Sequence, residues 1–175
     1  MIDYPKAQRD ALKDIAEFMA VASRTAPKTK GRDNLEIIII ESQPDRESLA
    51  KKMKEIASRD NRPSCERDAD NIKDSPYILI IGTSSEQLGL NCGFCGIPTC
   101  EKLKKTGGVC AYNSMDLGIA LGSAVSLAAN MRVDNRVMYS LGLAAMELKL
   151  FSGNILQAIG IPLSATGKNP FFDRK

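Results

Sequence analysis

Apolar and charged positions alternate with a helical period at the start of the chain. Apolar residues recur at this spacing over residues 11–22, which predicts an N-terminal helix that ends by Pro27. Pro44 begins a second helix, whose inner stripe is Leu49, Met53 and Ile56. This helix lies in a charge-laced surface region, residues 45–74, with eight basic and eight acidic residues.

Two runs of aliphatic residues break the helical pattern. Residues 35–40 and 77–82 are apolar without alternation, which predicts strands buried on both faces of a sheet. A last strand is expected over residues 159–166, followed by a polar tail over 167–175.

The pattern changes after residue 110, because only six of the 57 residues from 111 to 167 are charged. Two helices fit there, 114–131 with Ser114 as N-cap and 134–151 with Asp134 as N-cap. Both are apolar almost all round, so we expect them to be central and buried. A chain of this size has little surface to cover two such helices, which predicts a homodimer that buries one of them.

These elements predict one α+β domain over residues 1–175. Its small central sheet, from the strands at 35–40, 77–82 and 159–166, is packed by the apolar helices. Residues 85–112 follow the second strand and contain most of the cysteines. We expect this segment to be an inserted metal-binding subdomain.

The composition excludes several classes of chemistry. The chain has 175 residues, no histidine and a net charge of +3. Imidazole bases, histidine triads and histidine metal ligands are therefore excluded, and the charge is too small to indicate nucleic-acid binding. The first residues lack the pattern of a signal peptide, and no stretch fits a membrane span. We expect a cytoplasmic protein with reduced thiols and without a nucleic-acid or membrane partner.

Four of the five cysteines lie within nineteen residues, with the spacing C-x2-C-x4-C-x9-C: Cys92, Cys95, Cys100 and Cys110. Four thiolates suit a tetrahedral zinc ion or a [4Fe–4S] cluster. Thr99 is a suitable N-cap for a short helix that starts at Cys100, and Gly107 is a suitable C-cap. The chain can then return and place Cys110 beside Cys100.

The two metal centres make different demands on the backbone. Zinc ribbons use two C-x2-C knuckles, whereas this segment has one. Glycines between the cysteines let backbone N–H groups approach the bridging sulfides of a cluster: Gly93, Gly96, Gly107 and Gly108. We therefore predict a [4Fe–4S] cluster, and the alternative is a zinc-stapled interaction module without redox activity.

Residues 91–100 resemble the ferredoxin-type [4Fe–4S] segment of corrinoid iron–sulfur proteins. The resemblance implies four ligands, Cys92, Cys95, Cys100 and Cys110. The relatives have a longer span before the fourth cysteine, so Cys65 is the alternative to Cys110. The whole chain, including its ending at 160–174, resembles uncharacterised ferredoxin-domain proteins of anaerobic bacteria and archaea.

The order of elements is also similar to that of flavin nitroreductases, with Ala22–Pro27 before the first strand and Asp116–Ala120 opening an alanine-rich helix. That resemblance implies an α+β homodimer with FMN at the subunit interface, although the family's arginine-serine-arginine phosphate motif is missing. Residues 24–32 carry four basic residues and no acid. They form either a solvated basic loop or a phosphate site, for which Arg24 is the first candidate.

The sequence thus predicts one-electron transfer through a [4Fe–4S] cluster, to a flavin or to a partner protein. No general base or nucleophile stands out, so no catalytic residue is assigned. If the protein is an enzyme, the resemblance implies a nitroreductase-like flavin and iron–sulfur oxidoreductase.

Overall fold

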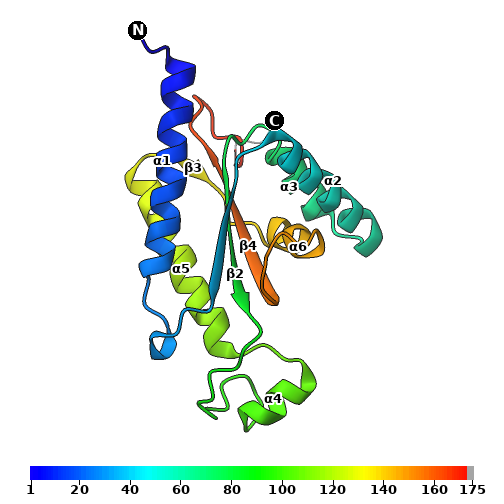
Figure 1. Cartoon of the computed structure of the whole chain (residues 1–175). Helices are drawn as coiled ribbons and strands as arrows, with labels where there is room; N and C mark the ends of the chain where they lie inside the picture. The colour runs from blue at the N-terminus through cyan, green and yellow to red at the C-terminus, as the bar shows by residue number, and fades with distance from the viewer. Residues whose placement is uncertain (173–175) are drawn as a thin grey trace.

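A four-stranded antiparallel sheet with the strand order β1-β2-β4-β3 lies between two groups of helices (Figure 1). The computed structural model describes residues 1–172. The last three residues of the expected polar tail, 173–175, lie outside the described residues. The small central sheet and its helical layers confirm the predicted α+β fold class.

The strands are β1 (Leu35–Ile40), β2 (Ile78–Ser84), β3 (Asp134–Asn135) and β4 (Ile155–Ser164). One face of the sheet packs against α1 (Tyr4–Thr25) and α5 (Ala111–Asn130). The other face packs against α2 (Gln43–Asp60), α3 (Pro63–Asn71) and α6 (Tyr139–Glu147). The short turn η1 (Thr29–Gly31) follows α1, and α4 (Cys100–Thr106) lies between β2 and α5.

Strand β2 belongs to two hydrophobic cores at once. Ile78 and Ile80 pack in the core with α2, α3 and α6, whereas Leu79 and Ile81 pack in the core with α1 and α5. Side chains alternate between the faces of a strand, so an unbroken apolar run serves both layers. The expected double-sided burial of this strand is confirmed.

The helix expected over residues 134–151 is wrong in its first part. Asp134 and Asn135 pair with β4 as strand β3, and α6 begins only at Tyr139. Asp134 does not cap a helix, because its carboxylate accepts a hydrogen bond from Asn169 Nδ2 at 2.9 Å. A contact with the C-terminal segment, distant in sequence, has overridden the local capping signal.

The expected helix over 114–131 begins one turn earlier, at Ala111, with Cys110 as its N-cap residue. Ser114, the expected cap, instead donates to Gln157 Oε1 at 2.6 Å. The last strand likewise begins at Ile155 rather than at 159, because it continues along β2 as far as Ser84.

The structure adds two features that were not predicted from the sequence. The charged region 45–74 contains a second helix, α3, whose inner face buries Cys65, Asp68 and Ala69. The C-terminal segment is not simply polar, because Phe171 is buried in the core with α2, α3 and α6.

The outer face of α5 remains exposed in the single chain. Met115 and Ile119 are 42% and 45% exposed, and a Cβ added at Gly118 or Gly122 would meet nothing within 4 Å. The single chain therefore leaves one face of this apolar helix uncovered, as expected from the sequence for a chain of this size. Within residues 1–172, no helix combines the length and the apolar character needed to cross a membrane.

Glycine allows α6 to lie directly on β4. A Cβ at Gly142 would come within 1.8 Å of the Ala158 carbonyl oxygen, and a Cβ at Gly160 would come within 2.2 Å of Leu141. Neither contact is sterically possible. The two glycines therefore set the distance between this helix and the sheet.

We predict that Gly142→Ala lowers the free energy of unfolding by roughly 1–3 kcal/mol or more, the usual cost of overpacking. The control is Ser58→Ala on the exposed face of α2, which adds no clash. Chemical denaturation followed by circular dichroism measures both variants. A Gly142→Ala protein as stable as the wild type would contradict the close helix–sheet packing.

Candidate metal centre

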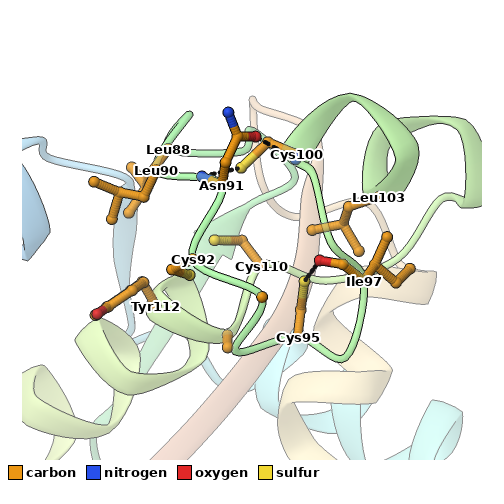
Figure 2. Close-up of a pocket in the computed structure, with 12 residues that line it drawn as sticks. Leu88, Leu90, Asn91, Cys92, Cys95, Ile97, Cys100, Leu103, Cys110 and Tyr112 are labelled. Atoms are coloured by element: carbon orange, nitrogen blue, oxygen red, sulfur yellow. Dashed lines mark hydrogen bonds between the residues drawn. The ribbon is translucent and has the colours of Figure 1, made fainter.

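Residues 85–112 run from the end of β2 into the first turn of α5 and lie at the lower end of the molecule in Figure 1. We call this segment the cysteine insert. Four of its cysteines line a single pocket, together with apolar residues that include Leu88, Ile97 and Leu103 (Figure 2): Cys92, Cys95, Cys100 and Cys110. The structure therefore brings the four sequence-predicted ligands to one place.

The short helix α4 shapes this pocket as the sequence predicted. Thr99 is its N-cap, and the Thr99 hydroxyl accepts a hydrogen bond from Lys102 N at 3.3 Å. Gly107 ends the helix in the left-handed conformation with φ 67°. The chain then turns back, so that Cys110 lines the same pocket as Cys100.

Backbone and side-chain groups already contact two of the thiols. Asn91 N donates to Cys100 Sγ at 3.3 Å, and Cys100 N donates to Asn91 Oδ1 at 2.8 Å. The Cys95 thiol donates to the Ile97 carbonyl at 3.8 Å. The first pair fixes Cys100 against the preceding loop, whereas the Cys95 contact requires a protonated thiol.

The cysteine insert has a very small core of its own. Only three buried residues form it, Leu88, Leu103 and Cys110, with partly buried neighbours around them. The rings of Phe94 and Tyr112 stack on its surface with a centroid distance of 5.6 Å. Packing alone therefore gives this segment little stability.

The thiols do not converge on a single point. Among residues 1–172, no three cysteine, aspartate or glutamate side chains are grouped closely enough to hold one metal ion. The four cysteines nevertheless line one pocket (Figure 2).

Cys65 lies elsewhere in the fold. It is on α3, completely buried in the core with α2 and α6, and its Sγ lies 4.0 Å from the Tyr139 hydroxyl. Cys110, in contrast, lines the pocket. The structure thus separates the alternative ligand from the other three cysteines.

The basic loop, residues 24–32, forms hydrogen bonds and an ion pair with other groups of the chain. Arg24 forms an ion pair with Asp33 and donates to the Leu35 carbonyl at 2.8 Å. The Lys28 amine donates to three backbone carbonyls at the end of α1. Burial lowers the pKa of this amine from its usual value, and the charge of Asp33 partly opposes that shift.

The same loop also contacts the cysteine insert and α5. Lys30 Nζ donates to the Leu88 carbonyl at 3.3 Å, and Arg32 pairs with Glu86 at 3.4 Å. Thr29 donates through its backbone N and its hydroxyl to the buried carboxylate of Asp116. The run of bases without acids in the sequence is therefore not isolated positive charge in the fold.

Sequence reasoning missed two buried polar residues on α5, Asn113 and Asp116, which are 0% and 2% exposed. Asp116 is the only charged residue between 111 and 130. Polar side chains on the inner face of an otherwise apolar helix were the available signal, because a buried polar group needs partners.

The chain is similar in sequence to a described family and to an archaeal protein. The family model described as an uncharacterized protein containing a ferredoxin domain matches residues 106–174, which include Cys110 but not the other three pocket cysteines. An uncharacterized protein of Archaeoglobus fulgidus is 39% identical over 176 residues, which span 95% of this chain and 94% of the relative.

Solved structures share the fold at low sequence identity. A nitroreductase with bound FMN from Bacteroides fragilis NCTC 9343 has a TM-score of 0.64 and 13% identity, and covers 93% of this chain and 81% of its own. A nitroreductase with bound FMN from Desulfitobacterium hafniense DCB-2 has a TM-score of 0.63 and 14% identity, with 89% and 78% covered. The chain spans 58% of YcnD from Bacillus subtilis and of NfrA2 from B. megaterium. The predicted nitroreductase-like fold is confirmed.

Proposed function

Because this chain belongs to the family of uncharacterized proteins that contain a ferredoxin domain, we propose that it transfers electrons through a [4Fe–4S] cluster held by its cysteine insert. The observation that carries the proposal is the single pocket lined by four cysteines. The cluster supplies one-electron chemistry when it is bound.

The sequence and backbone of the insert favour a cluster over zinc. Zinc ribbons use two C-x2-C knuckles, whereas this segment has one, Cys92 and Cys95. Gly93 and Gly96 lie between the pocket cysteines and have φ values of 75° and 79°. Such glycines let backbone N–H groups approach the bridging sulfides of a cluster.

The chain's own groups have defined tasks in this proposal. Asn91 N donates to Cys100 Sγ, and such N–H bonds stabilise the thiolate and help set the potential. Leu88 and Leu103, both 2% exposed, give the pocket an apolar lining. Cys95 must release the Ile97 carbonyl on ligation, because a ligating thiolate has no proton to donate.

We predict that replacing any one of the four pocket cysteines by serine sharply lowers the iron and sulfide content of anaerobically purified protein: Cys92→Ser, Cys95→Ser, Cys100→Ser and Cys110→Ser. Oxygen is a poor substitute for a soft thiolate at iron. Iron and sulfide assays with visible absorption measure the loss.

Cys65→Ser is the matched control, because Cys65 lies in the other core. It should keep the cluster content of the wild type. If Cys65→Ser lost the cluster while Cys110→Ser retained it, the proposed fourth ligand would be wrong.

FMN is a second candidate cofactor, because the fold matches nitroreductase structures that hold FMN. Arg24 is the phosphate ligand in this proposal. Within residues 1–172 both of its hydrogen bonds, to Asp33 and to the Leu35 carbonyl, come from Nη1. The guanidinium is therefore oriented, and its Nε and Nη2 remain to donate to a phosphate. The nearby Asp33 carboxylate opposes an anion and limits the affinity.

If FMN binds there, Arg24→Ala weakens binding at least tenfold, about 1.4 kcal/mol. Quenching of flavin fluorescence on titration measures the affinity. Arg9→Ala, an exposed arginine near the other end of α1, should bind FMN as the wild type does. The absence of saturable binding at millimolar FMN would remove the flavin and leave the cluster alone.

The outer face of α5 supports a homodimer. Met115, Gly118, Ile119 and Gly122 are exposed there, and α5 carries no exposed charged residue. The neighbouring helix α1 adds Phe18 at 56% exposure. Apolar faces of this kind are typical of protein interfaces, and a second copy of the chain is the occupant that we propose.

We predict a particle of twice the chain mass of 19.0 kDa in light scattering at micromolar concentration. Ile119→Lys should give a monomer, because it places a charge in the centre of the apolar face. Val137→Lys changes an apolar residue of similar exposure (49%) outside α1 and α5 and should leave the dimer intact. A monomeric wild type would overturn this part of the proposal.

A further inference from the structure

Asn113 lies where the two ends of the cysteine insert meet the body of the domain. Its Nδ2 donates to the carbonyl of Ser84 at 3.0 Å and to that of Glu86 at 2.7 Å. Ser84 is the last residue of β2, and Glu86 is the second residue of the insert. The Asn113 side chain is completely buried. One side chain on α5 therefore holds the start of the insert.

The other polar atoms of Asn113 are also bonded. Its Oδ1 accepts from Asn34 Nδ2 at 2.9 Å, and Asn34 directly precedes β1. Its backbone N donates to the Cys110 carbonyl at 3.0 Å. The side chain thus connects β1, the start of the insert and the first turn of α5, which begins at Cys110 as N-cap.

We propose that Asn113 is the positioning residue of the metal centre: it fixes Cys110 relative to the loop that carries the other three cysteines. This inference rests on the proposed function for its link to a cluster. Cys110 is one helical turn before Asn113, so the position of one constrains the other.

Because the core of the insert is so small, the insert needs the hydrogen bonds of the Asn113 side chain to hold its position. Leu88, Leu103 and Cys110 are its only buried residues. These hydrogen bonds require an amide side chain at residue 113, because both N–H donors and the carbonyl acceptor of asparagine are used. Alanine removes the side-chain donor that joins the carbonyls of Ser84 and Glu86 to α5, which favours an opening of the insert.

The first experiment measures the cysteines of the metal-free, reduced protein. A pulse of N-ethylmaleimide followed by mass spectrometry gives the alkylation rate of each cysteine. In Asn113→Ala we expect Cys110 to react at least tenfold faster than in the wild type, while the buried Cys65 on α3 is unchanged. Asn34→Ala removes only the hydrogen bond to Asn113 Oδ1, so we expect a smaller increase in the alkylation rate of Cys110. This variant is the substitute if Asn113→Ala does not fold.

The control is Ser123→Ala on the same helix, whose hydroxyl donates to the Ala22 carbonyl at 2.9 Å, away from the insert. It should leave Cys110 protected. Equal Cys110 rates in the wild type and in both asparagine variants would overturn the inference. A parallel rise at Cys65 would also overturn it, because it would indicate general loosening of the fold.

The second experiment uses protein loaded with iron and sulfide under anaerobic conditions. We expect Asn113→Ala to lose its visible absorption to a chelator at least tenfold faster than the wild type, with a shifted midpoint potential. An unchanged rate and potential would overturn the link to the cluster. A wild type that takes up no iron or sulfide would refute the proposed function, while the alkylation rates would still decide the role of Asn113.

Discussion

The shortage of buried residues in the cysteine insert is the constraint on which the rest of the site depends. Three buried side chains, Leu88, Leu103 and Cys110, cannot order residues 85–112 by packing alone. Two other sources of stability remain. One is a metal centre, whose binding energy contributes directly to folding when the ligands come from one short segment. The other is polar attachment to a body that is already rigid.

The body provides that attachment at several points. Strand β2 and helix α5 flank the insert, and both contribute buried residues to the core that contains α1. The loop after α1 reaches the insert through Lys30 and the Leu88 carbonyl, and through Arg32 and Glu86. Asp116 anchors the same loop at Thr29. Two of the four basic residues of this loop, Lys30 and Arg32, thus contact the insert. The hydrogen bonds of Arg24 and Lys28 go instead to the loop itself, to the end of α1 and to the start of β1.

The sequence predicted the elements whose signals are local. The aliphatic runs of β1 and β2, and the caps Thr99 and Gly107 of α4, act within a few residues, and the structure confirms them. Strand β3 was not predictable in this way, because it depends on pairing with β4 nearly thirty residues later. The hydrogen bonds of the Asn113 side chain depend on Asn34, Ser84 and Glu86, which are far away in the chain. A polar residue in an apolar helix shows that partners exist, but not which ones.

The central claim is that four thiolates in one pocket hold a [4Fe–4S] cluster. The most direct measurement is the elemental and sulfide analysis of protein purified without oxygen, combined with electron paramagnetic resonance after reduction by dithionite. The account predicts about four iron and four sulfide per chain, little zinc, and the signal of a reduced [4Fe–4S] cluster. A colourless protein with one zinc ion per chain and no sulfide would contradict it.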